Sequence, residues 1–197
     1  MRKILAGKPD PVKVEQARND ISELKEKESN GEINLAYFDE SGFSLTPSVP
    51  YGWQNIGERV ELRSSRSAQI NVAGFLLPKS DTLISWTFEC NINSEVVSKV
   101  FDKFAETIEK ETWVILDNAS FHRSKIMADR IASWASKKLF LYYLPPYSPK
   151  LNMIERVWQF MKYQWMPLSA YNSFQSLRES VDYMLTGYGS EYQITFG

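Results

Sequence analysis

The sequence lacks the features that mark several common protein classes. It contains one cysteine, Cys90, and one histidine, His122, so it forms no intrachain disulfide and offers no cluster of Cys and His ligands for zinc. No apolar run approaches the roughly 20 residues that cross a membrane, and the amino terminus shows no signal-peptide pattern. These absences favour a cytoplasmic protein that does not enter membranes.

A surplus of positive charge is also missing. The 23 Lys and Arg residues are balanced by 24 Asp and Glu residues, which gives a net charge of −1. A protein that binds DNA on its own usually carries a basic excess. Acidic ligands of a metal site would explain part of this balance, and a DNA-binding region outside this sequence would explain more. The content of 43% hydrophobic and 14% aromatic residues over 197 residues is typical of one globular domain.

What the sequence does contain is acidic residues at the ends of apolar segments. The run INLAYFDES, residues 33–41, reaches Asp39, and the run TWVILDN, residues 112–118, reaches Asp117. Both runs are rich in the residues that form buried strands. Ligands of α/β sheets gather at the carboxyl ends of parallel strands, so we expect these two side chains to converge there.

A third acid, Glu155, lies at the start of a predicted helix. Prolines after Leu144 end the preceding strand, and apolar residues then recur at steps of three and four: Leu151, Ile154, Trp158, Met161 and Trp165. Glu155 lies about 100° round the helix from Ile154, at the border of this apolar stripe. Asn152 and Glu155 also fit a capping box, in which Glu155 only satisfies the backbone amide of Asn152. The spacing leaves both interpretations open.

Three converging carboxylates repel one another unless a cation lies among them. Oxygen ligands without Cys or His suit Mg²⁺ or Mn²⁺. The sequence therefore predicts a divalent-metal site at Asp39, Asp117 and Glu155. Two ions, the arrangement of two-metal phosphoryl-transfer sites, are expected with substrate bound.

Three motifs carry a family resemblance: FDESGF (residues 38–43), LDNASFH (116–122) and LPPYSPKLNMIERVW (144–158). Together they resemble the catalytic core of the DDE transposases, in particular the bacterial insertion-sequence branch of the mariner-like superfamily, also called DDE superfamily endonucleases. The resemblance covers about residues 31–165, and Met153 stands where the family usually has proline. It implies that Asp39, Asp117 and Glu155 are the catalytic, metal-holding acids.

The resemblance also implies the substrate and the reactions. The substrate is double-stranded DNA, at the transposon ends and in the target, and the reactions are end cleavage and strand transfer. Synapsis of two ends favours a homodimer on DNA. Full-length relatives carry helix-turn-helix modules ahead of this core, and none is recognisable here. Two alternatives stay open: a catalytically silent DNA-binding or dimerising relic, and another ribonuclease H-like nuclease.

The predicted order of elements, β-β-β-α-β-α-β-α, is that of a ribonuclease H-like α/β fold, a mixed five-stranded sheet flanked by helices. Right-handed crossovers place the Asp39 strand beside the Asp117 strand. We expect a lead-in with one helix over residues 1–30, the catalytic domain over 31–166, and a helix and tail of the same domain over 167–197. One helix, capped by Ser124, should turn Met127, Ile131 and Trp134 inward.

Other polar residues are weaker candidates. His122 either approaches the reacting phosphate or bonds the loop backbone, and Asn118 is an accessory residue that more simply shapes a turn. Glu40 should point to the face opposite Asp39. Several basic residues could contact DNA phosphates or could simply be solvated: Arg59, Arg63 and Arg66 of a predicted hairpin extension, and Lys150 and Arg156 near Glu155.

Overall fold

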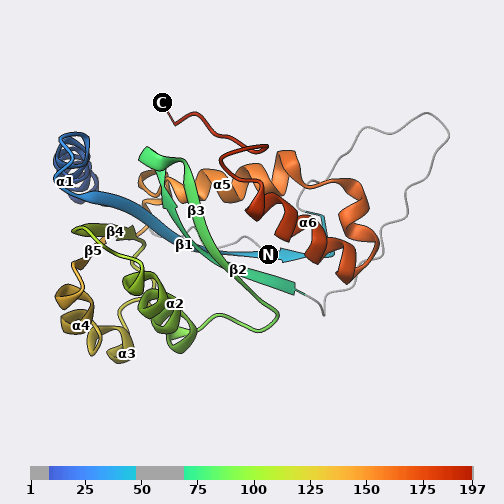
Figure 1. Cartoon of the computed structure of the whole chain (residues 1–197), viewed down its shortest axis with the longest axis horizontal. Coiled ribbons are helices and arrows are strands. Elements are labelled where there is room, and N and C mark those ends of the chain that lie inside the picture. Colours follow the sequence, from blue (N-terminus) through green and yellow to red (C-terminus); the bar gives the residue numbers. More distant parts are fainter. Residues whose placement is uncertain (1–8, 48–68, 197) are drawn as a thin grey trace.

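The computed structural model describes residues 9–47 and 69–196, and its centre is one five-stranded sheet (Figure 1). The strand order is β3-β2-β1-β4-β5. β1 is parallel to β4 and β4 to β5, whereas β1 with β2 and β2 with β3 are antiparallel. The strands are β1 (Asn34–Ser44), β2 (Gln69–Leu77), β3 (Thr82–Phe88), β4 (Thr112–Leu116) and β5 (Leu139–Tyr143). The predicted mixed five-stranded sheet is confirmed.

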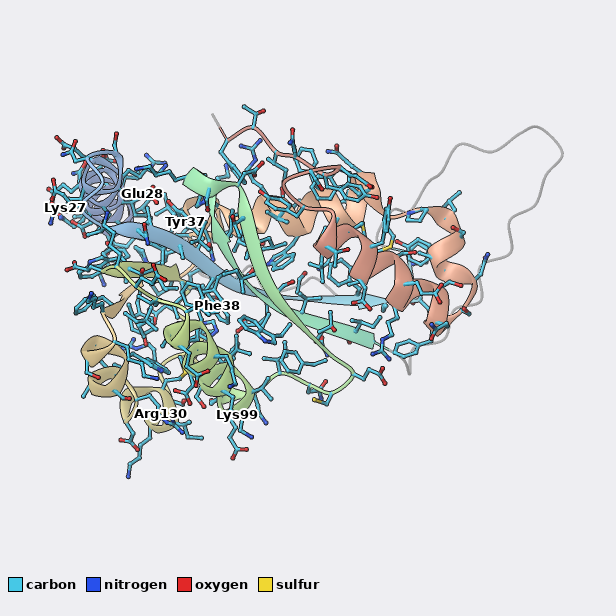
Figure 2. All side chains as sticks on the ribbon, viewed as in Figure 1. Lys27, Glu28, Tyr37, Phe38, Lys99 and Arg130 are labelled. Atoms are coloured by element: carbon cyan, nitrogen blue, oxygen red, sulfur yellow. The ribbon has the colours of Figure 1, made fainter. Side chains whose placement is uncertain are left out.

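Helices cover both faces of this sheet, so its inner strands β1, β2 and β4 are buried on two sides, while the edge strands β3 and β5 are only partly buried. Successive residues of β1 point to opposite faces, as Tyr37 and Phe38 do in Figure 2. Tyr37 belongs to one apolar core, which also contains residues of α1 (Pro11–Ser29), α5 (Ile154–Phe160) and α6 (Phe174–Thr186). Phe38 belongs to the other, with residues of α2 (Ser94–Glu106), α3 (Lys125–Ala128) and α4 (Ile131–Ser136). Because both faces are covered, the strands read as continuous apolar runs rather than as alternating ones.

Four of the helices in the described residues begin at a residue whose side chain caps the first turn. Asp10, Asn93, Ser124 and Ser173 each accept hydrogen bonds from backbone amides of the first turn of α1, α2, α3 and α6. The helices are α1 (Pro11–Ser29), α2 (Ser94–Glu106), α3 (Lys125–Ala128), α4 (Ile131–Ser136), α5 (Ile154–Phe160) and α6 (Phe174–Thr186). In the described part of the chain, none is long and apolar enough to cross a membrane.

The prediction of a single helix after Ser124 is wrong, because two short helices are found there. The structure breaks it into α3 and α4, with a turn between them in which the Arg130 amide bonds the Met127 carbonyl. Met127 and Trp134 are buried as expected, but Ile131 is 44% exposed. The break changes the helical phase, so a residue on the expected apolar face turns to solvent.

The segment around Glu155 is less regular than one helix. A 3-10 turn over Pro149–Leu151 precedes α5, and a π-helical turn over Met161–Trp165 follows it. Ile154, Trp158 and Met161 are buried, as their spacing predicts. Most of the predicted hairpin extension after β1 lies outside the described residues.

Removal of a central aromatic ring should test the packing of the α2 side. The Phe75 side chain is fully buried, and its ring stacks on Phe104 with centroids 3.9 Å apart. We expect Phe75→Ala to lower the free energy of unfolding by about 3–5 kcal/mol, through lost transfer energy and a residual cavity. Urea denaturation measures this loss. Val12→Ala, at a site 77% exposed, should change it by less than about 0.5 kcal/mol. Equal effects of the two changes would contradict the assigned core.

Candidate active site

Two of the three predicted acids lie where the parallel pairing of β1 with β4 ends. Asp117 directly follows β4, but β1 does not end at Asp39 as the sequence suggests: it continues to Ser44, paired with β2. In the ladder between β1 and β4, Phe38 is paired with Leu116, and Asp39 and Asp117 are the next residues along each chain. Asp39 is 9% exposed and pairs across the other side of β1 with Gly74 of β2. The middle of the sheet thus brings the two carboxylates to one edge, as the topology predicts.

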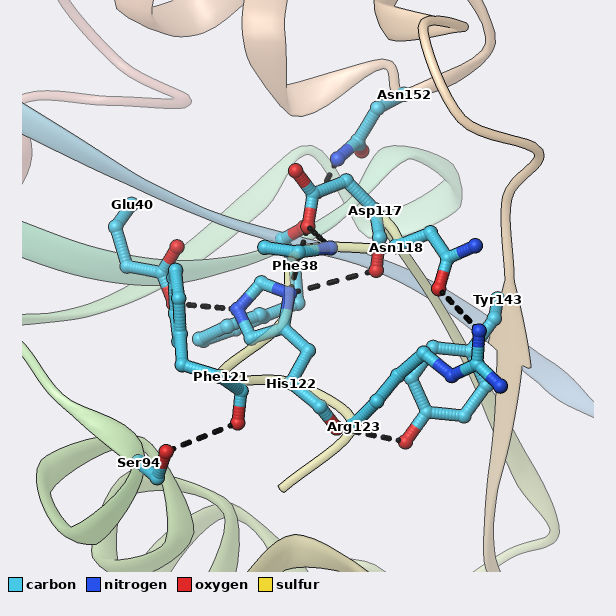
Figure 3. Close-up of polar contacts among 11 residues, drawn as sticks. Phe38, Glu40, Ser94, Asp117, Asn118, Phe121, His122, Arg123, Tyr143 and Asn152 are labelled. Carbon is cyan, nitrogen blue, oxygen red and sulfur yellow. Dashed lines mark hydrogen bonds and ion pairs between the residues drawn. The ribbon is translucent and has the colours of Figure 1, made fainter.

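The third acid is brought to the same edge by a buried asparagine. The Asn152 side-chain amide donates a 2.9 Å hydrogen bond to the carbonyl of Phe38, the residue before Asp39 (Figure 3). This bond ties the start of α5 to β1 three residues before Glu155. The helix begins after Met153 without a side-chain cap, so the capping box between Asn152 and Glu155 does not form.

A glycine on β2 lets α5 lie close to the sheet. A Cβ atom built on Gly74 would lie 3.1 Å from the Trp158 ring, closer than side chains normally pack. Gly74 faces Asp39 in the strand ladder, and Trp158 follows Glu155 by three residues on the helix. The missing side chain therefore lets α5 approach the strand that carries Asp39.

The three carboxylates influence one another electrostatically. Burial holds the pKa of Asp39 well above its usual range, and the charges of Glu40, Glu155 and Asp117 add to this effect. Burial also raises the pKa of Glu155; nearby Lys162 opposes the rise, and Asp117 adds to it. Negative charge on Asp39 and Glu155 therefore carries an electrostatic cost in the folded protein.

His122 lies between two acids and is fully buried (Figure 3). Its Nδ1 is 2.6 Å from Oδ1 of Asp117, and its Nε2 is 2.9 Å from Oε1 of Glu40. Burial alone would lower the pKa of His122, but the two carboxylates outweigh it and raise this pKa to about 10. Burial would likewise raise the pKa of Asp117, yet the bonds from His122 and the Ala119 amide leave it lowered. His122 is therefore an imidazolium that fixes the orientation of Asp117.

This position of His122 was not foreseen from the sequence, because it depends on Glu40. Glu40 points away from Asp39, as strand alternation predicts, and reaches the histidine from the far face of β1. The surrounding loop is held by further bonds: the Tyr143 hydroxyl donates to the His122 carbonyl, and Arg123 donates to the Asn118 side chain. Asn118 is thus engaged within its own loop.

Lys162, which was not predicted from the sequence, lines a cavity of about 460 Å³ together with Asp39 and Glu155. Burial lowers the pKa of Lys162, although both acids favour its charged form. Its ammonium group lies 5.4 Å from the centre of the Phe43 ring. Lys162 is two helical turns after Glu155, a spacing that places both on one helix face and could have revealed it. Tyr163, 56% exposed, lines the same cavity.

The donor set fits a hard divalent cation. Asp39, Asp117 and Glu155 are partly desolvated, and the negative charge of one makes ionisation of its neighbours less favourable. A cation bound among them would relieve this repulsion. Within residues 9–47 and 69–196, no three His, Cys, Asp or Glu side chains gather closely enough to hold one ion. The three acids are therefore near enough to affect one another's ionisation, but among the described residues they do not converge on one ion as the sequence predicts.

Of the basic residues predicted to contact DNA, the structure describes two, Lys150 and Arg156. Lys150 and Arg156 are exposed and line a second cavity, which also borders Glu155. The guanidinium of Arg156 lies 5.5 Å from the centre of the Phe196 ring. Arg59, Arg63 and Arg66 lie outside the described residues.

Comparison with known proteins adds to this geometry. A protein of Sinorhizobium fredii (strain NBRC 101917 / NGR234), "Uncharacterized protein y4pE/y4sA", is 29% identical over 105 residues, which cover 53% of this chain and 66% of that protein. The catalytic domain of Mos1 mariner transposase is similar in structure with a TM-score of 0.62 and 10% identity, covering 95% of this chain and 87% of that chain. A Mos1 mariner paired end complex with Mn gives a TM-score of 0.64 and 13% identity, covering 97% and 61%.

At such low identity the structural likeness concerns the fold, and it is the ribonuclease H-like fold of transposase catalytic domains. The chain spans less than two thirds of the length of the Sinorhizobium protein and of the Mos1 chain in the paired end complex. A family model described as "DDE superfamily endonuclease" matches residues 34–178, a segment that contains Asp39, Asp117 and Glu155. The chain belongs to the DDE superfamily endonuclease family.

Proposed function

We propose that this chain is the catalytic part of a DNA transposase, of the bacterial insertion-sequence type, that cleaves DNA at transposon ends and joins those ends to target DNA. The observation that supports this most directly is the placement of Asp39, Asp117 and Glu155 at one sheet edge, where their charges oppose one another. The family membership and the fold of the Mos1 catalytic domain agree with it.

Asp39 and Asp117 would share one divalent ion, and Asp39 and Glu155 a second, both Mg²⁺ or Mn²⁺. When bound, such ions activate the attacking hydroxyl and stabilise the leaving oxygen of a phosphodiester. Asp39 is the residue common to both pairs, which suits its central place on β1. The Mos1 paired end complex named with Mn is consistent with this choice of metal.

The other residues of the site hold these acids and the DNA. His122 and the Ala119 amide engage Oδ1 of Asp117, so Oδ2 would be the oxygen left to hold a metal ion. Lys162, beside Asp39 and Glu155, would pair with a DNA phosphate once metal ions neutralise the two acids. The exposed Tyr163 ring at the same cavity offers a surface on which a base can stack.

Loss of one carboxylate should separate catalysis from folding. We expect Asp117→Asn to reduce Mn²⁺-dependent nicking of supercoiled plasmid DNA by at least about 10²-fold, more than the usual cost of an outer-shell change. Asp129→Asn, the same change at an exposed position, should cut like the parent. Circular dichroism checks that each variant is folded, and electron paramagnetic resonance measures Mn²⁺ binding. A folded Asp117→Asn protein that nicks like the parent overturns the proposal, as does a parent that neither nicks DNA nor binds Mn²⁺.

Removal of the costly charge at Asp39 should stabilise the metal-free protein. Because the pKa of Asp39 is raised by folding, its ionised form destabilises the native state increasingly as pH rises above the ordinary value of 3.8. We expect Asp39→Asn to raise the free energy of unfolding at pH 7 by about 1–3 kcal/mol, and the gain to shrink towards pH 4. Urea denaturation in EDTA at several pH values measures it.

With Mn²⁺ present, the parent should become the more stable of the two proteins. Mn²⁺ should raise the melting temperature of the parent, since a ligand that binds only the native state stabilises it, and should leave Asp39→Asn nearly unchanged. A destabilised Asp39→Asn protein in EDTA, or equal Mn²⁺ shifts in both proteins, would argue against a repulsive site relieved by metal.

A further inference from the structure

We propose that helix α1 forms part of the DNA-binding surface, and that a cavity between α1 and the start of α5 holds the sugar–phosphate backbone of substrate DNA next to Glu155. This inference rests on the proposed function, because it places DNA and not another polyanion in the cavity. We call this space the basic cavity and define it by Arg18, Lys25, Tyr37, Lys150, Asn152 and Arg156.

The basic cavity has a volume of about 650 Å³ and joins segments that are far apart in the sequence. Arg18 and Lys25 of α1 form one wall, and residues 149–159, around the start of α5, form the other. Tyr37 of β1 also lines the cavity. A space of this size accommodates a nucleotide unit, since ligand pockets commonly measure about 300–1,000 Å³.

The charge of the basic cavity differs from that of the whole chain. Four basic residues line it against one acid, Glu155, although the chain carries a net charge of −1. Arg18 forms an exposed ion pair with Glu15, and exposed pairs of this kind contribute little. Among the described residues Lys25 and Lys150 form no ion pair, so both remain available to an anion.

Two residues that line this cavity, Tyr37 and Asn152, each carry a buried oxygen atom. The hydroxyl of Tyr37 and the side-chain carbonyl of Asn152 have no hydrogen-bond partner among the described residues, and both side chains are at least nine-tenths buried. Buried polar atoms are almost always satisfied, by protein or by ordered water. Less than 1 Å² of either atom is exposed, so a ligand in the cavity would contact them only after a rotation of their side chains.

The position of the basic cavity relates it to the catalytic acids. Glu155 lines both this cavity and the one that contains Asp39 and Lys162. A DNA strand whose backbone lies in the basic cavity can therefore continue to the carboxylates at the sheet edge. The family match begins at residue 34, so Arg18 and Lys25 lie outside it, and the family assignment does not include this wall.

Charge-neutral variants of α1 test the proposal. Arg18→Gln with Lys25→Gln removes two charges from the basic cavity, and Lys13→Gln with Lys27→Gln removes two exposed charges of the same helix that do not line it. Lys27 lies on the outer side of α1 (Figure 2). Glutamine keeps nearly the same helix propensity as lysine and arginine, so both double variants should fold alike.

DNA affinity is measured by fluorescence anisotropy of a labelled duplex at several salt concentrations, with EDTA present so that no cleavage occurs. For Arg18→Gln/Lys25→Gln we expect about a 10-fold loss of affinity and a salt slope smaller by roughly 2, one for each lost phosphate contact. Lys13→Gln/Lys27→Gln should bind within about twofold of the parent. Equal losses in both double variants, or no loss in either, overturn the proposal.

Lysine protection gives an independent readout on the unaltered chain. Acetylation of surface lysines, followed by mass spectrometry, should show that DNA protects Lys25 and Lys150 but leaves Lys13 and Lys27 reactive. If the parent binds Mn²⁺ and nicks DNA while Lys25 stays as reactive as Lys27, the role of α1 is wrong and the proposed catalytic function stands. If nicking and Mn²⁺ binding are both absent, the proposed function itself fails.

Discussion

One buried hydrogen bond, from the Asn152 amide to the Phe38 carbonyl, governs how this site is put together. Phe38 precedes Asp39 on β1, and Asn152 precedes Glu155 at the start of α5, so the bond sets the distance between two acids more than a hundred residues apart in the chain. Both ends of the bond lie in the interior, where an unpaired amide or carbonyl costs about 1–3 kcal/mol. The bond therefore holds the loop between β5 and α5 firmly against β1, although this loop is built from turn residues.

When they are ionised, the acids held in this way lower the free energy of unfolding. Burial and neighbouring carboxylates raise the pKa of Asp39, and the cluster gains partial relief from Lys162 on one side and His122 on the other. The histidine bonds Asp117 and Glu40 at once, so β1 and the loop after β4 are joined beneath the carboxylates. Such a site is poised for a cation, since a metal ion removes the repulsion that the protein otherwise sustains.

The elements that support the site are also those that depart from regular geometry. A π-helical turn follows α5, and Lys162 and Tyr163 both belong to it. π turns are rare and recur at functional sites because they alter the direction of side chains without ending the helix. Gly74, opposite Asp39, lets Trp158 and α5 lie against the sheet. The α1 side adds a basic wall beside the same helix.

The sequence by itself determined the central strands, because Asp39 and Asp117 follow apolar runs that only a doubly covered sheet can bury, and their parallel pairing follows from right-handed crossovers. It did not determine where β1 ends, since β1 continues past Asp39 to Ser44 through its pairing with β2. It also determined the apolar face of α5, through residue spacing. Only the tertiary structure decided the bond of Asn152 to β1, the place of His122 between two acids, the exposure of Ile131 and the meeting of α1 with residues 149–159. Each of these depends on contacts between residues distant in sequence or on a break in helical phase, and local periodicity carries no information about either.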